Sequence, residues 1–326
     1  MTHSADIPTG LIWYGDDQPG ITRRRAGRGF SYLAPDGTRI DRGAERQRIE
    51  ALAVPPAYED VWISPRQNGH LQATGYDART RKQYRYHPDY SAFRARTKFD
   101  DLAAFGAALP RIRRRVHAAL TDNAKTEAFA IAATLRLIDR ASLRVGTPDY
   151  ATDNQVYGAT TLRSRHLRLD GTRIRLDYRA KGGQRVRKQL TDRTLQRALD
   201  KIDDLPGGAL MQYRDGDGTL RQLGPDQVNG WLNDITGRDG LTAKTFRTWN
   251  GSVAALDAAL RSPAPVSIKA MAEAAAQTLH NTPTIARNSY IHPAVIDLAG
   301  STDLPAAPDG PTGLRQAERA LLALLT

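Results

Sequence analysis

The chain has 326 residues, with 47 lysine and arginine residues against 35 acidic ones, a formal net charge of +12 and no cysteine. This length suffices for one large or two ordinary domains, and the excess positive charge favours a polyanionic partner such as nucleic acid. The absence of cysteine excludes disulfides, thiolate metal sites and cysteine nucleophiles. The N-terminus has no secretory signal pattern and no run is long enough to span a bilayer, so we expect a soluble cytoplasmic protein without a membrane partner.

The sequence predicts a small β-rich domain over residues 1–90. Two turn signals, Pro35-Asp36-Gly37 and Asn68-Gly69, each lie between short runs that are typical of strands. These runs are 30–33 and 38–40 around the first turn, and 61–63 and 70–74 around the second. A short helix is expected between the two hairpins, from residue 44 to residue 52.

From residue 91 onward the pattern becomes helical. Apolar side chains recur at helical spacing from residue 125 to residue 143, and Gly146 provides a stop signal. Arg136, Arg140 and Arg144 are four residues apart, which places them on one side of this helix. Further helices are predicted at 192–205, 225–236, 244–260, 267–280 and 314–325.

A β insertion interrupts the helices. Asp170-Gly171 between alternating runs is the strongest short hairpin signal, and a second turn at 180–183 leads into a third run. The three runs are 166–169, 173–178 and 185–188. We therefore expect an α+β protein, in which the small β-rich domain precedes a larger, mostly α-helical domain over residues 91–326 that carries a three-stranded antiparallel sheet.

The acidic segment Asp215-Gly216-Asp217-Gly218 invites a metal-site interpretation. It lacks the further acidic ligands and the terminal glutamate of a calcium-binding loop, so a polar hairpin turn is the better interpretation. No phosphate-binding loop motif is present either. We accordingly predict no metal, no ATP and no other cofactor.

The chemistry centres on Tyr290, which follows three separated basic residues, Arg144, Lys181 and Arg247. A tyrosine hydroxyl can attack phosphorus and hold a nucleic-acid strand end covalently, provided that positive charge lowers its pKa from a reference value of about 10. Fixed arginines stabilise the negative charge of the transition state. A lysine can protonate the departing oxygen, and Lys181 stands in a two-glycine turn from which it can reach.

Each of these residues alone carries little weight. An arginine at a helix end usually stabilises the helix dipole, a lysine in a glycine-rich turn is usually solvated, and a tyrosine is usually a packing residue. The basic runs at 23–25 and 111–115 can likewise be solvated faces, although the net charge of +12 favours phosphate contact. The ordered set of four contexts is what favours catalysis.

These contexts resemble those of the type IB DNA topoisomerases, specifically the small poxvirus-like enzymes of bacteria. In the N-terminal part, the resemblance is carried by residues 23–32, 54–63, 69–75 and 81–87. In the rest of the chain, it is carried by residues 137–146, 157–163, 180–182, 246–249 and 289–293. The resemblance implies that residues 91–326 adopt the catalytic fold shared by tyrosine recombinases and type IB topoisomerases.

The resemblance also implies a function and roles for the site residues. The chain would relax supercoiled duplex DNA by transient single-strand cleavage, strand rotation and religation, without ATP or metal. Tyr290 would be the nucleophile that forms a 3′-phosphotyrosine link. Lys181 would be the general acid for the 5′ hydroxyl with help from Arg144, while Arg144 and Arg247 would stabilise the transition state.

One position departs from the pattern of many family members, which carry a histidine nine residues before the tyrosine. This sequence has Asn281 there, with His280 one place earlier. Asn281 can donate a hydrogen bond to a non-bridging phosphate oxygen but cannot supply a cation, and whether His280 assists it stays open. A second departure is Asn250, which follows Arg-Thr-Trp where alanine is common.

Duplex DNA is the implied partner, bound by a monomer that closes around it as a clamp, in the cytoplasm and associated with the nucleoid. Residues expected to contact DNA are Gln72, Arg81, Lys82, Tyr84 and Tyr86 in the N-terminal domain, and Arg140, Arg163 and Lys244 in the catalytic domain. Such contacts would be mostly to phosphates and therefore sensitive to salt.

Two other functions compete with this interpretation. A tyrosine recombinase uses the same arginine, lysine and tyrosine chemistry, but recombinases usually carry a helical arm-binding module where this chain has a β-rich one. A non-catalytic DNA-binding protein of the same fold is disfavoured, because Tyr290, Lys181 and both arginines are all present.

Overall fold

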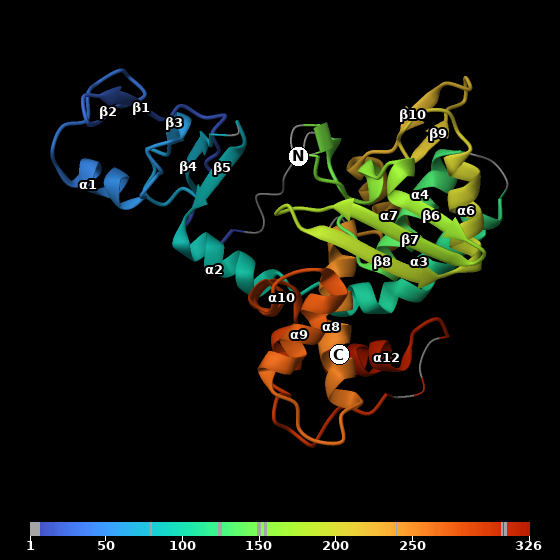
Figure 1. Cartoon of the computed structure of the whole chain (residues 1–326). Coiled ribbons are helices and arrows are strands. Elements are labelled where there is room, and N and C mark those ends of the chain that lie inside the picture. Colours follow the sequence, from blue (N-terminus) through green and yellow to red (C-terminus); the bar gives the residue numbers. More distant parts are fainter. Residues whose placement is uncertain are drawn as a thin grey trace. The chain divides into compact units, whose positions relative to one another are not determined.

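The structure is a computed structural model, which describes residues 7–78, 80–122, 126–148, 151–152, 155–238, 240–307, 309 and 312–326. The chain divides into two compact units, Met1–Lys98 and Phe99–Thr326 (Figure 1). The boundary predicted at residue 90 falls inside helix α2, Pro88–Thr97. Tyr90 accounts for the later boundary, because its buried ring lies 5.1 Å from the ring of His70 and 5.4 Å from that of Tyr86. The first turn of α2 therefore packs with the N-terminal sheet.

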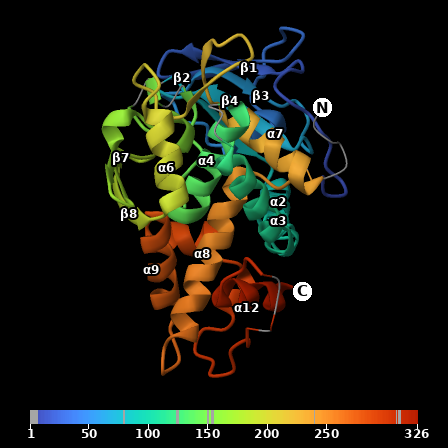
Figure 2. The ribbon, with the colours of Figure 1, turned by 90° about the vertical axis from the view of Figure 1, so that its right-hand side faces the viewer.

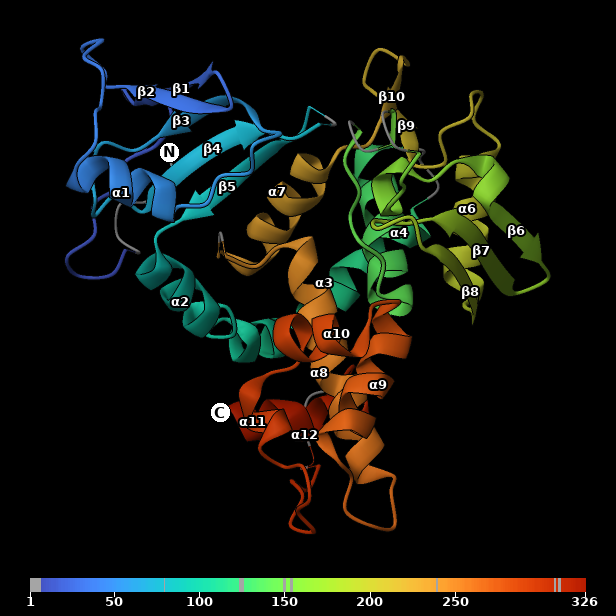
Figure 3. The same cartoon turned by 60° about the vertical axis from the view of Figure 1, so that its left-hand side comes forward.

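The first unit is built on a five-stranded antiparallel sheet of order β2-β1-β3-β4-β5, shown with helix α1 in Figure 3. Its elements are β1 Ile21–Ala26, β2 Gly29–Leu33, α1 Ala44–Ala51, β3 Glu59–Ile63, β4 Leu71–Tyr76 and β5 Lys82–Tyr86. Ile21, Ile49 and Ile63 are buried together in its core. The hairpin predicted around Asn68-Gly69 is confirmed by the pairing of β3 with β4, whereas the one around residues 35–37 is reduced to a single bridge.

Strand β1 was not predicted, because its sequence contains the basic run at 23–25. Arg23 donates hydrogen bonds to three carbonyl oxygens of the segment 54–58 at 2.6 to 3.0 Å. Its guanidinium carbon also lies 4.1 Å from the ring centroid of Phe30. At least this member of the run is therefore a structural residue and not a solvated cation.

The second unit is mostly helical and carries two small antiparallel sheets. Its helices are α3 Leu102–Thr121, α4 Glu127–Ala141, η1 Ala159–Thr161, η2 Ser164–His166, α6 Arg193–Asp203, α7 Pro225–Thr236, α8 Ala243–Leu260, α9 Ile268–Leu279, α10 Pro283–Tyr290, α11 Pro293–Ile296 and α12 Gln316–Leu325. Its strands are β6 Leu167–Asp170, β7 Arg173–Arg179, β8 Arg185–Thr191, β9 Gln212–Arg214 and β10 Leu220–Gln222. The predicted α+β organisation, with a β-rich part followed by a helical part with sheets, is confirmed.

The three-stranded sheet β6-β7-β8 is the one predicted around Asp170-Gly171. The acidic segment 215–218 is confirmed as a polar turn, since it joins β9 to β10 and Asp215 accepts hydrogen bonds from the amides of Asp217 and Thr219. Within the described ranges, no group of acidic and histidine side chains is arranged to hold a metal ion. No helix in the described part of the chain is long and apolar enough to cross a membrane.

Helix α8 is central to the second unit. It contacts α3, α4, α9, α10 and α12, and Figure 2 shows it running beside α9. Phe246 and Trp249 on α8 are fully buried, with ring centroids 4.9 Å and 6.0 Å from that of Phe105 on α3. The packing of α8 on these helices therefore fixes its position, so that side chains on α8 can contact several segments of the chain.

Helix α4 ends earlier than predicted. Its N-cap is Thr126, whose side chain accepts a hydrogen bond from the Phe129 amide, and it ends at Ala141 because Ser142 adopts a left-handed conformation with φ of 55°. Arg144 consequently lies beyond the helix, and the prediction that it shares one helix face with Arg136 and Arg140 is wrong.

Candidate active site

Tyr290 is the last residue of α10, and α8 fixes its position. The helix begins after Thr282, whose hydroxyl accepts a hydrogen bond from the Ile285 amide at 3.3 Å. A Cβ atom on Gly251 of α8 would lie 2.6 Å from the Tyr290 carbonyl oxygen, so the close approach requires glycine. The hydroxyl of Ser252 donates to the same oxygen at 3.3 Å. The nucleophile candidate thus stands against a rigid helix.

Arg247 lies one turn before Gly251 on α8 and connects three segments of the chain. Its side chain is only 3% exposed, and its guanidinium carbon lies 5.0 Å from the ring centroid of Tyr290. It donates hydrogen bonds to the carbonyl oxygen of Ser142 and, at 3.0 Å, to that of Leu279. The guanidinium is therefore held between the ends of α4 and α9 and faces the tyrosine ring.

Arg144 lies on the segment that follows α4. The left-handed Ser142 donates its amide to the Ile138 carbonyl oxygen at 2.8 Å, which closes the helix. The amide of Ala159 then donates to the Arg144 carbonyl oxygen at 2.8 Å, so the short helix η1 fixes this backbone. The guanidinium donates through Nη2 to Oδ1 of Asn281 at 2.7 Å. Two residues of the predicted catalytic set are therefore in direct contact.

His280 and Asn281 point in different directions. His280 ends α9 in a left-handed conformation with φ of 50°. Its ring nitrogens lie 3.1 Å and 3.2 Å from the carbonyl oxygens of Gln277 and Arg187. The imidazole is thus used to hold α9 on β8, while the amide of Asn281 lies beside the Arg144 guanidinium.

The site leaves two buried donors without a partner in the described part of the chain, Nε of Arg247 and Nδ2 of Asn281. Buried donors in folded proteins are normally satisfied, so this pair is an opening for an acceptor from outside the protein. Burial raises the pKa of Tyr290, but the positive charge of Arg247, followed by those of Arg144 and Lys244, lowers it below the ordinary value. An anion and an activated phenol are both favoured here.

Lys181 lies in the exposed turn between β7 and β8, where Gly182 and Gly183 have φ of 85° and 75°. A small pocket of about 10 Å³ is lined by residues from four of the segments that carry the family resemblance, namely Arg144, Tyr157, Ala180 and Arg247. His280 lines it as well. The turn that carries Lys181 therefore begins at the edge of the site.

Lys188 is a residue of this region that the sequence interpretation missed. Its ammonium group donates to the carbonyl oxygen of Thr278 at 2.6 Å, and it lines the same small pocket. Burial, together with the charge of Arg247, lowers the pKa of Lys188 to about 8. The strand alternation contained the signal, because residue 188 lies on the same face of β8 as the buried Val186.

Four of the five predicted DNA-contact residues of the first unit form two groups, an exposed tyrosine pair and two ion-paired cations. Tyr84 and Tyr86 are 49% and 45% exposed and stacked, with ring centroids 6.0 Å apart. Lys82 is ion-paired with Asp16 at 2.6 Å and Arg81 with Asp77 at 2.5 Å.

Gln72 departs from the expectation of a surface contact. Its side chain is buried, and its amide donates hydrogen bonds to the carbonyl oxygens of residues 66, 67 and 69. Its amide oxygen accepts from Arg48 at 3.2 Å. The turn between β3 and β4 needs these bonds, so the side chain braces that turn.

The three candidates of the second unit are all exposed. Lys244 lies in the first turn of α8 and acts on Tyr290 through its charge. Arg140 lies 3.6 Å from Asp192, and Arg163 immediately precedes the short helix η2.

Two family models match the chain. The model described as "Eukaryotic DNA topoisomerase I, catalytic core" matches residues 88–287, and the one described as "Bacterial DNA topoisomerase IB, N-terminal domain" matches residues 29–77. The first match alone covers more than half of the chain, which therefore belongs to the type IB DNA topoisomerases. The resemblance inferred from the sequence motifs is confirmed, and the chain is an enzyme whose substrate is DNA.

Two relatives are similar to this chain. DNA topoisomerase 1B of Acanthamoeba polyphaga mimivirus is 27% identical over 289 residues, which is 83% of this chain and 85% of the viral protein. DNA topoisomerase 1 of Mycosarcoma maydis is 27% identical over 177 residues, which is 48% of this chain and 17% of the fungal protein. The core match includes Arg144, Lys181, Arg247 and Asn281 and ends shortly before Tyr290.

Proposed function

We propose that this topoisomerase relaxes supercoiled duplex DNA through a 3′-phosphotyrosine intermediate at Tyr290, with strand rotation and religation and without ATP or metal. The observation that carries the proposal is a pair of buried donors, Arg247 Nε and Asn281 Nδ2, that have no partner among the described residues, together with the lowered pKa of Tyr290. The non-bridging oxygens of a phosphodiester would supply the hydrogen-bond acceptors that these two donors lack within the described residues. The arginines supply the positive charge that the transition state requires.

Cleavage begins when the Tyr290 oxygen attacks phosphorus. The bond from phosphorus to the tyrosine oxygen forms as the bond from phosphorus to the 5′ oxygen breaks, and the phenol proton passes to solvent. Lys181 donates a proton to the leaving 5′ oxygen. Arg144, Arg247 and Asn281 hold the non-bridging oxygens, and their fixed positions avoid reorganisation during the step.

Religation is the reverse reaction. The 5′ hydroxyl gives its proton back to Lys181 and attacks phosphorus, and Tyr290 leaves. The phosphotyrosine link conserves the energy of the phosphodiester, so no nucleotide is consumed. Between the two steps, the free 5′ end rotates about the intact strand and releases torsional stress.

DNA binding in this proposal uses both units of one monomer, which closes as a clamp on DNA of the nucleoid. The exposed tyrosines Tyr84 and Tyr86 of the first unit and the exposed cations Arg140, Arg163 and Lys244 of the second are the proposed contacts. Arg81 and Lys82 would first exchange their acidic partners for phosphates, and Gln72 would act through the turn that it braces. One protein per short duplex, measured by analytical ultracentrifugation, is the expected stoichiometry.

The test is relaxation of supercoiled plasmid by the purified protein in EDTA without ATP. Complete relaxation by the wild type, with none by Tyr290→Phe, is expected. Strand exchange between two specific duplexes would indicate a recombinase. Binding without either reaction would leave a non-catalytic DNA-binding protein.

A further inference from the structure

Asn250 lies three residues after Arg247 on α8, so the two side chains leave the same face of the helix. The Asn250 side chain is buried, and its amide nitrogen donates at 3.0 Å to two acceptors, the carbonyl oxygen of Asp139 and the hydroxyl oxygen of Ser142. Because a carbonyl group can only accept, the nitrogen of the amide and not its oxygen must face Asp139. Asn250 therefore binds α8 to the last turn of α4 and to the residue that ends this helix.

Ser142 is the corner at which the chain turns from α4 toward Arg144. Its φ of 55° is left-handed, a conformation that a residue other than glycine adopts at a cost in free energy. Its amide donates to Ile138, its carbonyl oxygen accepts from Arg247, and its hydroxyl oxygen accepts from Asn250. Two side chains of α8 therefore hold the corner, and Arg144 lies two residues beyond it.

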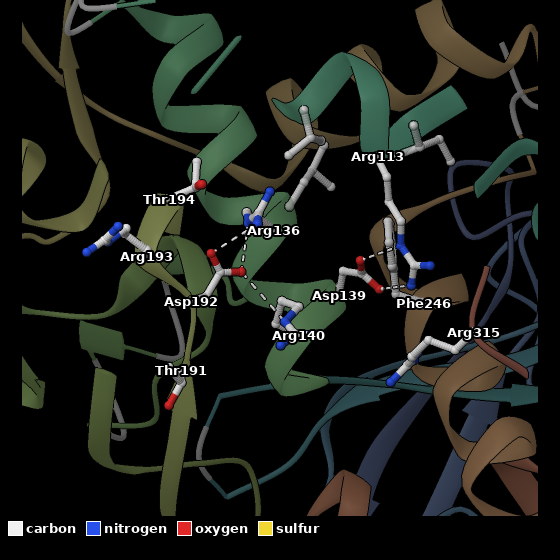
Figure 4. Close-up of a pocket in the computed structure, with 13 residues that line it drawn as sticks. Arg113, Arg136, Asp139, Arg140, Thr191, Asp192, Arg193, Thr194, Phe246 and Arg315 are labelled. Carbon is white, nitrogen blue, oxygen red and sulfur yellow. Dashed lines mark hydrogen bonds and ion pairs between the residues drawn. The ribbon is translucent and has the colours of Figure 1, made fainter. Parts of the chain in front are cut away.

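The other acceptor of Asn250 belongs to a residue that is itself fixed. The carboxylate of Asp139 accepts two hydrogen bonds of 2.9 Å from Arg113 on α3. Figure 4 shows these two side chains facing each other. The backbone of Asp139 is therefore a stationary point to which the amide of Asn250 is bound, and the same amide carries this restraint to the Ser142 corner.

Packing alone does not account for an asparagine at position 250. Its amide oxygen is buried and has no hydrogen-bond partner among the described residues. A buried polar atom without a partner is destabilising, and an alanine would remove this penalty. What the asparagine provides and an alanine cannot is the pair of bonds that hold the corner.

We propose that Asn250 is a positioning residue for DNA cleavage, which acts on both arginines of the active site through the Ser142 corner. The corner presents the carbonyl oxygen that orients the guanidinium of Arg247. It also begins the segment from which Arg144 reaches Asn281. This role rests on the proposed function, in which the two arginines stabilise the transition state, and a displacement of about 1 Å can slow such a step roughly 100-fold.

The test measures the rate of covalent adduct formation on duplex DNA under enzyme excess. DNA affinity is followed by fluorescence anisotropy, and stability by urea unfolding. Asn250→Ala should slow cleavage by roughly 10-fold to 100-fold and leave DNA affinity within about twofold of wild type, since it disturbs the transition-state contacts and not the DNA surface.

Gln212→Ala is the matched control. The side chain of Gln212 is also buried, and its amide nitrogen also donates two hydrogen bonds, to the carbonyl oxygens of Leu205 and Pro206. It lies on β9 and does not contact the Ser142 corner. This variant should lower the urea midpoint as Asn250→Ala does, yet cleave DNA within about twofold of the wild-type rate.

Ser142→Gly separates geometry from stability and keeps the test decisive if Asn250→Ala does not fold. Glycine adopts the left-handed conformation without strain, which offsets the lost hydrogen bond, so the urea midpoint should stay close to that of wild type. Cleavage should nevertheless slow by roughly tenfold. The double variant should be slower than the slower single variant by no more than about threefold, because both changes remove the same bond.

Three results would overturn the role of Asn250 alone. The first is cleavage by Asn250→Ala and by Ser142→Gly within about twofold of wild type. The second is equal slowing by Gln212→Ala, which would assign the effect to lost stability. The third is fully multiplicative slowing in the double variant, which would show that Asn250 does not act through Ser142. A wild type that forms no adduct would refute the proposed function itself, and the role of Asn250 with it.

Discussion

Arg247, which is buried, and Arg113, which is partly buried, are two arginines of the same unit with opposite surroundings. Arg113 donates to Asp139, Glu318 and the Gly313 carbonyl oxygen. Burial lowers the pKa of Arg113, but its bonds to Glu318 and Asp139 outweigh this and raise it. Burial lowers the pKa of Arg247 as well, and the positive charge of the nearby Arg144 lowers it further. Among the described residues, no carboxylate is bound to Arg247 that would offset these two effects.

The difference teaches how a structural arginine is distinguished from a functional one. The carboxylates around Arg113 satisfy its charge within the fold, so its removal should act on stability. Arg247 is held by neutral carbonyl groups, and its Nε has no partner in the part of the chain that the structure describes, so its charge is available to an external anion. The following changes test that contrast, beginning with the largest expected effect.

Arg247→Lys should slow single-turnover cleavage of duplex DNA by about 100-fold to 1,000-fold, because lysine keeps the charge but loses the planar fork. The measurement is the rate of covalent adduct formation under enzyme excess. DNA affinity, followed in parallel by fluorescence anisotropy, should change much less. A cleavage rate within about threefold of wild type would remove Arg247 from the mechanism.

Lys181→Ala should slow cleavage by about 100-fold or more on an ordinary duplex, since the 5′ oxygen then leaves without its proton donor. A duplex whose 5′ leaving oxygen is replaced by sulfur should recover most of this loss, because a thiolate leaves without protonation. Equal slowing on both duplexes would argue against the general-acid role. Recovery on the sulfur-substituted duplex would show that Lys181, an exposed cation in the β7–β8 turn, has a functional role like that of Arg247.

Arg113→Met should lower the free energy of unfolding by about 3 kcal/mol, because Asp139 would lose its ion-pair partner and the buried Glu318 would keep only Arg315. Urea unfolding is the measurement. Arg114→Met, an exposed neighbour on α3, should change the unfolding free energy by less than about 0.5 kcal/mol. Unaltered stability of Arg113→Met together with lost cleavage would reverse the assignment of the two arginines.

The smallest expected effect is the contribution of Lys188 to the pH dependence of stability. In the folded protein its pKa of about 8 lies below the ordinary lysine value of 10.5, so between these two pH values the unfolded chain binds more protons than the folded one. The stability of wild type relative to Lys188→Met should therefore rise as the pH increases from 8 to 10.5, by on the order of 1 kcal/mol. A difference that is flat with pH would show that the ammonium group is not buried as described.

The sequence sufficed for elements with strong local signals. Asp170-Gly171 predicted the hairpin at the start of the three-stranded sheet, and the glycine-rich turn predicted the position of Lys181. The order of Arg144, Lys181, Arg247 and Tyr290 predicted the family. Each turn, and each short context around one of these four residues, is carried by neighbours in the chain, so sequence patterns alone can reveal it.

Features that depend on distant partners could not be predicted. Arg113 belongs to a basic run that resembles a solvated face, and its partner Glu318 is 205 residues away. Asn250 is only a departure from a common alanine until its bonds to Asp139 and Ser142 are seen. Tyr90 ties α2 to the first unit through ring contacts that periodicity does not encode.

The central claim is that Tyr290 carries the DNA 3′ end. The most direct measurement is mass spectrometry of peptides from the detergent-trapped protein–DNA adduct after nuclease digestion. We predict a nucleotide linked through its 3′ phosphate to the peptide that contains Tyr290, and no such peptide from Tyr290→Phe. An adduct on another residue, or one that persists in Tyr290→Phe, would contradict the account.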